Sequence, residues 1–348
     1  MNTAKIDLHL HLDGSLNMHW AWQTAVKRGV VAPECTFEQY YDQMHRTNFK
    51  TREEGFKRFD FPIAILQTRE DLREGTYTLI RDLNDQGLIY AEIRFAPQQH
   101  MLEGLTQLET IEAVLEGVHA AEKDFPDITC GLICCMMHKG ERAAFNEKLN
   151  FDTIDAADIF YKRGERIALD LAGYENTGPF MDYAPLFEKA RALNIPYTIH
   201  AGEMGDGSHV PEARFFVSTK VVTAKAQMGA WRIGHGINCV QDPAWLKELA
   251  DKQIPTEVCV GSNVKEERNY AAHPVREMFK AGVKITINTD NMNFSKTSLA
   301  NEHNQLRAIG FTTDDLIQFT YNAVDAAFCD EATKSKLREK LAAEGIKR

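Results

Sequence analysis

The stretch Lys5-Ile6-Asp7-Leu8-His9-Leu10-His11-Leu12-Asp13-Gly14 lies near the start of a chain of 348 residues. Its apolar residues alternate with polar ones, and a period of two indicates a β-strand. The alternation puts His9 and His11 on one face of this strand, so both imidazoles can reach a single metal ion. Gly14 and Ser15 then break the strand. A metal site at this point needs further ligands from elsewhere in the chain.

The composition is ordinary for a globular protein, with 44% hydrophobic and 26% charged residues. The formal net charge of −10 argues against nucleic acid or an anionic membrane surface as the main partner. The sequence has no apolar run of about 18 residues and no signal-peptide pattern. Five of the seven cysteines lie in apolar, strand-like runs, which indicates buried, reduced thiols: Cys130, Cys134, Cys135, Cys239 and Cys259. No Cys-x-x-Cys pair is present, which argues against a structural zinc ribbon and a cytidine-type deaminase site. We expect a cytoplasmic protein, without nucleic-acid or membrane partners, that is a monomer or a weak homo-oligomer.

Eight apolar segments along the chain have strand character, and each precedes helical sequence. After the opening segment, the predicted strands are 88–95, 128–137, 167–172, 197–200, 232–235, 256–260 and 283–288. The predicted helices are about 68–86 (with Gly87 as its C-cap), 106–123, 143–162, 183–193, 217–228, 243–252 and 275–281. Eight βα units favour an α/β fold of the (β/α)₈ TIM-type barrel kind, as one domain over residues 1–348. A doubly wound sheet is the alternative, but no strand here precedes Gly-x-Gly-x-x-Gly.

Residues 15–85 separate the first two strands and read as an insertion of extra helices. Pro62 predicts a turn within it, because a proline interrupts a helix. Phe59 and Phe61 either close over a bound ligand as an apolar lid or belong to the core.

Polar residues cluster at the predicted C-terminal strand ends, where barrels carry their active sites. These ends are His9-Leu10-His11, Asp170-Leu171-Ala172-Gly173, His200-Ala201-Gly202-Glu203, Gly234-His235-Gly236, Gly261-Ser262-Asn263 and Asn288-Thr289-Asp290-Asn291. Burying several unpaired histidines and carboxylates would cost on the order of several kcal/mol each. A shared chemical task explains them better than packing.

Four of these residues have the chemistry of metal ligands: His9, His11, His200 and Asp290. Barrel closure would set the eighth strand beside the first, so that Asp290 neighbours the histidine pair. Nitrogen and carboxylate ligands suit zinc, with iron or another divalent ion as alternatives. Such a metal lowers the pKa of a coordinated water from about 16 toward ~7. A second metal is not expected, because the fourth strand does not end in lysine.

Two further strand-end residues have the chemistry of catalytic groups. His235 could orient and deprotonate the water from its ring nitrogen. Glu203, three residues after His200, is expected to be a general acid rather than a surface carboxylate. His138 could line the pocket, and His273 is expected to cap a helix before Pro274. Ser262 could bond either the substrate or its own loop backbone.

Together, these strand-end motifs resemble the adenosine deaminases, in the order of that family and over residues 5–291. Members of the family are (β/α)₈ metal-dependent hydrolases that convert adenosine to inosine and ammonia. The resemblance implies one zinc on the four predicted ligands and implies that Glu203 protonates N1 of the purine. It further implies that His235 steers the attacking hydroxide to C6, that Gly173 donates its backbone N–H to N3, and that Asp13 meets the ribose 5′ hydroxyl. His11 and Asn291 complete the expected substrate contacts.

Two positions depart from the pattern of the family. Asn291 stands where many members carry a second aspartate that meets N7 of the purine. Because N7 is an acceptor, the amide of Asn291 can donate to it without being protonated first. Tyr174 follows Gly173 where an acidic residue is common, and this affects the pocket wall.

The predicted function is therefore zinc-dependent deamination of adenosine, and of 2′-deoxyadenosine, in purine salvage. An Asp13 with room for a ribose favours a nucleoside, since relatives that act on adenine tend to carry glutamate there. The alternatives are deamination of adenine or of an N6-modified or otherwise modified adenine nucleoside at the same metal site. A purine-binding protein without catalysis is a third possibility, which the presence of Glu203 and His235 argues against.

Overall fold

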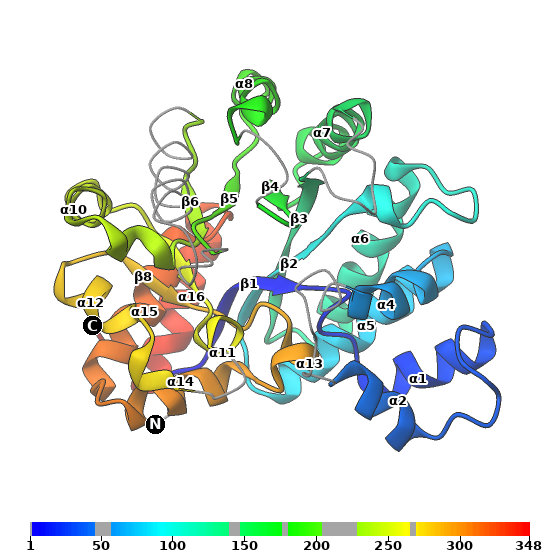
Figure 1. Cartoon of the computed structure of the whole chain (residues 1–348), viewed down its shortest axis with the longest axis horizontal. Helices are drawn as coiled ribbons and strands as arrows, with labels where there is room; N and C mark the ends of the chain where they lie inside the picture. The colour runs from blue at the N-terminus through cyan, green and yellow to red at the C-terminus, as the bar shows by residue number, and fades with distance from the viewer. Residues whose placement is uncertain (1, 46–56, 139–146, 176–179, 204–227, 265–268) are drawn as a thin grey trace.

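The computed structural model describes residues 2–45, 57–138, 147–175, 180–203, 228–264 and 269–348. Parallel strands form a barrel at the centre, with helices around it (Figure 1). The strands are β1 (Ile6–His11), β2 (Tyr90–Phe95), β3 (Thr129–Met137), β4 (Ile167–Ala172), β5 (Thr198–Ala201), β6 (Arg232–His235), β7 (Thr256–Val258) and β8 (Ile285–Ile287). β1–β4 and β5–β8 form two runs, joined by bridges from Leu10 to Asp290 and from Leu169 to Tyr197. The predicted (β/α)₈ TIM-type barrel is confirmed.

The closure between β1 and β8 depends on side chains as well as backbone. The N–H of His11 donates to the Asp290 carbonyl at 2.9 Å, and the N–H of Asp290 donates to the His9 carbonyl at 2.7 Å. One residue before His9, the N–H of Leu8 donates to Oδ1 of Asn288 at 2.9 Å. An amide side chain thus takes the place of a backbone carbonyl at Leu8, which lies in the stretch where the register between β1 and its other neighbour, β2, shifts. This closure sets Asp290 beside the two histidines, as the sequence predicted.

The helices that surround the barrel agree with the predicted ones to within a few residues where both are described. They are α5 (Arg69–Asp85), α6 (Gln107–Asp124), α7 (Glu147–Lys162), α8 (Ala184–Ala192), α10 (Pro243–Asp251) and α12 (Val275–Lys280). Gly87 follows α5 with a φ of +83°, in the role of a helix stop. The predicted helix at 217–228 falls almost wholly outside the described residues.

Short elements and a C-terminal group of helices complete the described chain. They are η1 (Lys57–Phe59), η2 (Pro97–Gln99), η3 (Phe180–Tyr183), η4 (Ile237–Gln241), η5 (Tyr270–Ala272), α11 (Val260–Asn263), α13 (Met292–Ser295), α14 (Leu299–Ala308), α15 (Thr313–Ala326) and α16 (Glu331–Ala343). The predicted strand at 256–260 is too long, because Val260 begins α11. A buried carboxylate, that of Glu302, accepts from the Gly261 N–H at 2.8 Å and holds this short helix.

The predicted insertion of extra helices after the first strand is confirmed. It contains α1 (Met18–Lys27), α2 (Phe37–Met44) and α4 (Asp60–Ile65) ahead of α5. The predicted turn at Pro62 is wrong, because Pro62 is the third residue of α4. A proline is tolerated there, since N–H groups in the first helical turn have no acceptor within the helix. Asn17 connects α1 to α5. Its Oδ1 accepts from the Trp20 N–H in the first turn of α1, and its Nδ2 donates to Asp82 on α5 at 2.7 Å.

The core has an apolar layer between strands and helices and a charged interior inside the barrel. On β2, Ala91, Ile93 and Phe95 join the apolar layer. The alternate residues Glu92 and Arg94 point into the barrel and form buried ion pairs there. None of the described helices is both long and apolar enough to cross a membrane.

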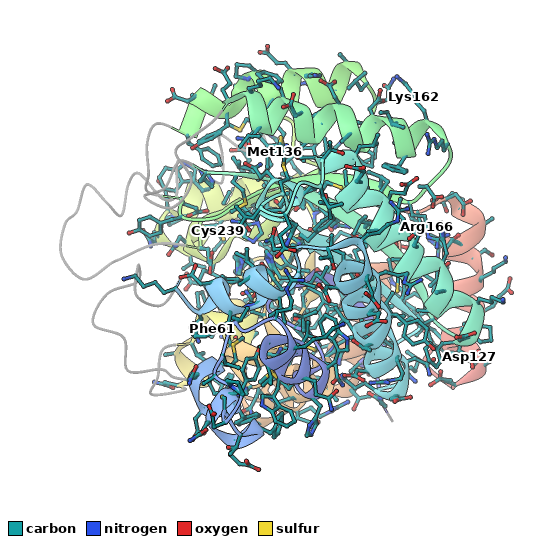
Figure 2. All side chains as sticks on the ribbon, turned by 90° about the vertical axis from the view of Figure 1, so that its right-hand side faces the viewer. Phe61, Asp127, Met136, Lys162, Arg166 and Cys239 are labelled. Carbon is teal, nitrogen blue, oxygen red and sulfur yellow. The ribbon has the colours of Figure 1, made fainter. Side chains whose placement is uncertain are left out.

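The two ends of the barrel are distinct. Figure 2 shows Asp127 and Arg166, which precede β3 and β4, on one side of the molecule. Phe61 and Cys239, which follow β1 and β6 in the chain, lie toward the opposite side. The second side is therefore the one at which the strands end and the polar residues gather.

Two buried histidines make the stability of the fold depend on pH. Burial lowers the pKa of His100 to about 4 and that of His303 to about 3. Both rings stay neutral in the folded protein, whereas the unfolded chain takes up a proton on each below about pH 6.5. Below that pH the unfolded state binds more protons, so the fold loses stability as the pH falls toward 4.

We expect His303→Gln to flatten this pH dependence by up to about 1.4 kcal/mol per pH unit between about pH 6 and pH 4. The free energy of unfolding, measured by urea titration across that range, checks it. His119, half-exposed on α6, supplies the control variant His119→Gln. Equal slopes for His303→Gln and the unmodified chain would contradict the prediction.

Candidate active site

Three histidines and a carboxylate converge at the C-terminal ends of β1, β5 and β8. One nitrogen or oxygen atom from each of His9, His11, His200 and Asp290 lies within 4.8 Å of the others. The Nε2 atoms of His9 and His11 lie 3.6 and 3.3 Å from Oδ1 of Asp290. Two ligands at about 2.1 Å from one zinc ion are at most about 4.2 Å apart. The four predicted ligands are therefore close to the spacing that one metal ion requires.

Backbone strain marks two residues at this end of the barrel. Asp290 has a φ of +62° and His235 a φ of +59°, in the left-handed region that residues with a Cβ avoid. Such a conformation costs about 1–3 kcal/mol and persists only where the surroundings impose it. His235 is the last residue of β6, and Asp290 lies three residues after the end of β8, where the chain leaves the barrel. The turn directs both side chains to the histidine cluster.

Carboxylates inside the barrel select which nitrogen each histidine presents. Nδ1 of His9 donates to Oε2 of Glu257 at 2.7 Å. Nδ1 of His200 lies 2.8 Å from Oδ2 of Asp170. The Nε2 atoms are thereby left for the cluster, an arrangement typical of metal-binding histidines. Nε2 of His9 is buried and makes no hydrogen bond within the described residues.

Arg94 joins these two carboxylates. Its Nη1 donates to Asp170 at 2.7 Å, and its Nη2 donates to Glu257 at 2.9 Å. All three side chains are fully buried. The sequence prediction missed these roles, although Asp170 was noted as the end of the fourth strand. Arg94 and Glu257 lie inside predicted strands, where a charged residue on the barrel-facing side was the available signal.

Burial and neighbouring charges prepare the cluster for a cation. Burial lowers the pKa of His9 and, more strongly, that of His11, so both rings are neutral at pH 7. Burial alone would raise the pKa of Asp290, but the nearby histidines hold it well below the usual value. For His200, the Asp170 carboxylate outweighs burial and raises the pKa. Metal binding at His200 would therefore compete with protonation of the ring.

The donor set fits a divalent metal ion. Three imidazoles and one carboxylate are ligands that zinc prefers, and the buried Nε2 of His9 has no other hydrogen-bond partner among the described residues. Charge also favours a cation, because the buried arginines Arg94 and Arg232 face the carboxylates of Glu92, Asp170 and Glu257. With Asp290 these side chains carry two positive and four negative charges, which one divalent cation would balance.

Glu203 and His235 lie beside the same cluster. Nε2 of His235 is 3.8 Å from Oε2 of Glu203. One atom from each of these residues and from Asp290 lies within 4.8 Å of the other two. The amide of Asn263 lies 3.0 Å from Nδ1 of His235 and orients the ring. The predicted acid and the predicted base therefore meet at one edge of the candidate metal site.

The predicted substrate-binding residues lie around the same rim. Asp13 is buried, accepts from the Gly14 N–H at 2.9 Å, and has its pKa raised by burial to about 7. Nδ2 of Asn291 donates to Oδ1 of Asp290 at 2.7 Å. A Cβ on Gly14 would lie 1.8 Å from Oδ1 of Asn291, so only glycine fits there. Gly173 directly follows β4.

Other residues that the sequence singled out have mainly structural contacts. Oγ of Ser262 donates to Oδ2 of Asp290 at 2.5 Å, which is neither of the two predicted uses. His138 is buried against Phe180 and Tyr183. His273 caps a helix as predicted, since its Nδ1 accepts from the Val275 N–H at 3.0 Å. Phe59 packs edge-on against Phe294, next to the Asp290 turn.

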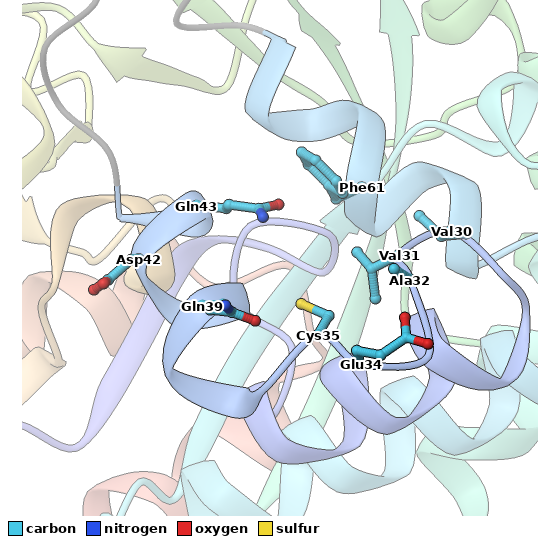
Figure 3. A pocket seen from close by; sticks show the side chains of 9 residues that line it. All are labelled: Val30, Val31, Ala32, Glu34, Cys35, Gln39, Asp42, Gln43 and Phe61. Carbon is cyan, nitrogen blue, oxygen red and sulfur yellow. The ribbon is translucent and has the colours of Figure 1, made fainter.

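A hollow of ≈ 660 Å³ lies apart from these residues, in the insertion (Figure 3). Val30, Val31 and Cys35 line it together with residues of α2 and with Phe61 of α4. None of the candidate metal, acid or base residues contributes to its wall. The chemistry therefore points to the strand ends rather than to this hollow.

A model of the adenosine deaminase family matches residues 4–344. The chain belongs to the adenosine deaminase family. An adenosine deaminase from Haemophilus ducreyi is 35% identical over 338 residues, covering 95% of this chain and 94% of that protein. An adenosine deaminase from Clostridium perfringens is 32% identical over 343 residues, covering 97% and 98%.

The fold is also that of solved deaminase structures. An adenine deaminase from Arthrobacter aurescens superposes with a TM-score of 0.83 at 22% identity, covering 99% of each chain. An amidohydrolase from Burkholderia ambifaria with bound zinc superposes with a TM-score of 0.81 at 23% identity, covering 98% of this chain and 91% of that one. At these identities the likeness supports the fold, and the family assignment rests on the sequence matches.

We expect Asp170→Asn to weaken divalent-metal binding by about 10- to 100-fold, because it removes the charge that orients His200. Competition with a chromophoric chelator measures the affinity, and thermal unfolding of the metal-free protein checks that the barrel remains folded. Asp152→Asn, in a surface ion pair on α7, is the matched control. An Asp170→Asn variant that binds metal as tightly as the control would rule out this role.

Proposed function

We propose that this chain hydrolytically deaminates adenosine and 2′-deoxyadenosine, releasing ammonia and the corresponding inosine nucleoside. The observation that carries the proposal is the meeting of Glu203 and His235 beside Asp290 and the histidine cluster. An acid and a base at one point serve a reaction in which water is added to one atom while a neighbouring atom is protonated. Membership of the adenosine deaminase family supports the substrate class.

Glu203 and His235 divide the proton transfers. Glu203 gives its proton to N1 of the purine, which makes the adjacent C6 more electrophilic. His235 orients the attacking water and accepts its proton as the oxygen bonds to C6. The two side chains approach to 3.8 Å, so both can reach neighbouring atoms of one ring. The C6–N bond then breaks as the amino group takes up the proton that His235 accepted and leaves as ammonia. The new hydroxyl on C6 returns a proton to Glu203 as the carbonyl of the inosine product forms.

One zinc ion is proposed on His9, His11, His200 and Asp290. Bound zinc would supply Lewis-acid activation of the attacking water. The unpartnered Nε2 of His9 and the three-imidazole, one-carboxylate donor set support this assignment. The zinc in the similar fold from Burkholderia ambifaria is consistent with it.

Four residues are proposed to hold the nucleoside: His11, Asp13, Gly173 and Asn291. Asp13 receives the 5′ hydroxyl of the ribose, and the Gly173 N–H donates to N3. Asn291 donates to N7 and His11 contacts the substrate beside the metal. Burial raises the pKa of Asp13 to about 7, so this side chain can either accept from or donate to a hydroxyl at neutral pH.

The second candidate is deamination of adenine or of an N6-modified adenine nucleoside by the same residues. This candidate is retained because the fold is also that of an adenine deaminase. The two candidates differ at the sugar end of the site, where Asp13 would face either a ribose or no ligand atom.

A substrate panel on zinc-loaded protein tests the proposed function. Adenosine and 2′-deoxyadenosine should be converted with a higher kcat/KM than adenine or N6-methyladenosine, as followed by the absorbance change and by ammonia release. Glu203→Gln should lower kcat by at least about 100-fold while zinc content stays unchanged, because it removes the transferable proton. Glu188→Gln, exposed on α8, is the control. A preference for adenine would replace the main proposal with the second candidate.

Asn291→Ala separates substrate binding from metal binding. Because the amide is proposed to donate to N7, we expect kcat/KM for adenosine to fall about 10- to 100-fold, the loss of one hydrogen bond at a buried site. Zinc content by metal analysis should fall much less. Equal losses of zinc and of kcat/KM would instead assign Asn291 to the support of Asp290, to which it already donates.

A further inference from the structure

A buried arginine connects the candidate metal site to the opposite end of the barrel. Arg232 begins β6 and is almost completely buried. Its Nε donates to Oε1 of Glu257 at 2.6 Å, and its Nη1 donates to the backbone carbonyl of Ala326 at 2.9 Å. Ala326 is the last residue of α15, one of the helices near the C-terminus of the chain. One guanidinium therefore spans from a carboxylate under the metal site to the connection between α15 and α16.

The same connection holds Arg232 from a second direction. The ring of Phe328 lies under the guanidinium, with its centroid 3.7 Å from Cζ. The N–H of Phe328 donates to Oε1 of Glu92 at 2.6 Å, and Oε2 of Glu92 accepts from Nη2 of Arg232 at 2.6 Å. Oη of Tyr90 donates to Oε1 of Glu92 at 3.0 Å. Residues 326–328 thus contact both Arg232 and its second carboxylate partner, Glu92.

Glu257 connects Arg232 to His9, one of the four proposed metal ligands. Its Oε1 accepts from Arg232, and its Oε2 accepts from Nδ1 of His9 at 2.7 Å. A carboxylate is rigid and planar, so a shift of Arg232 moves the oxygen that orients the His9 ring. All of these side chains are buried, and close packing transmits small displacements with little loss.

We propose that the α15–α16 connection, residues 326–328, is a positioning element for the metal ligand His9, acting through Arg232 and Glu257. The inference rests on the proposed metal site and goes beyond it, because it assigns a metal-affinity role to residues that touch neither substrate nor metal. Phe328 matters most, since its ring shields the guanidinium from water and holds it by a cation–π contact. Without the ring, Arg232 gains freedom, and Glu257, which Arg94 still holds at Oε2, keeps His9 less firmly in one orientation.

The zinc affinity of Phe328→Leu tests the proposal. We expect zinc to bind about 3- to 10-fold more weakly than to the unmodified chain, a smaller loss than for direct partners of metal-ligating histidines. Chelator competition gives the affinity. The visible spectrum of the Co²⁺-substituted protein should also change, because it reports the geometry of the ligands.

Phe311→Leu is the matched control. Phe311 lies in the connection between α14 and α15, as Phe328 lies between α15 and α16. It too has a nearby guanidinium, that of Arg276 at 5.5 Å, but Arg276 is exposed on α12. Thermal unfolding of both metal-free variants separates lost stability from lost metal affinity. Arg232→Lys, which keeps the charge and loses the fork geometry, should weaken zinc binding in the same direction as Phe328→Leu.

Two results would overturn the proposal in distinguishable ways. Zinc affinity and a Co²⁺ spectrum for Phe328→Leu equal to those of Phe311→Leu would overturn the positioning role and leave the proposed function intact. Failure of the unmodified chain to bind zinc would overturn the metal site itself, and the positioning role with it.

Discussion

The contact on which the functional end of this barrel depends is the bridge from Arg94 to Asp170 and Glu257. Each carboxylate faces a histidine, His200 or His9, so one guanidinium fixes two candidate ligands that are 191 positions apart in the chain (His9 to His200). Burying three charged groups is expensive unless each is paired. Arg94, Asp170 and Glu257 are all paired, because their positions on β2, β4 and β7 direct the three side chains into the interior of the barrel.

Two further constraints act on the same residues. Barrel closure is made by backbone bonds between His9, His11 and Asp290, so the strand that completes the fold also brings the carboxylate to the imidazoles. Asp290 and His235 then adopt a left-handed backbone conformation, which places their side chains at the rim. The cost of that conformation is offset by the contacts around it, which explains why strain concentrates where the chemistry is expected.

The surroundings of Asp290 explain how this chain accommodates Asn291. Oδ1 of Asp290 accepts from the Asn291 amide at 2.7 Å, and Oδ2 accepts from Ser262 at 2.5 Å. An aspartate at position 291 would bring a second negative charge next to the first unless one of them were protonated. The asparagine removes this repulsion and adds a donor. The absence of a side chain on Gly14 makes room for the amide.

The sequence by itself determined the barrel, the extra helices after its first strand, and the set of residues at the strand ends. It could do so because strand alternation is local and because active residues in a barrel follow strands at a known end. Only the tertiary structure decided the partners of those residues. In the sequence, Arg94, Glu257 and Arg232 are only charged residues within predicted strands. Their role comes from ion pairs across the barrel, in which Glu257 pairs with both arginines. The early end of β7 was likewise decided by a distant contact, since the carboxylate of Glu302 holds the Gly261 N–H, and no local pattern encodes this.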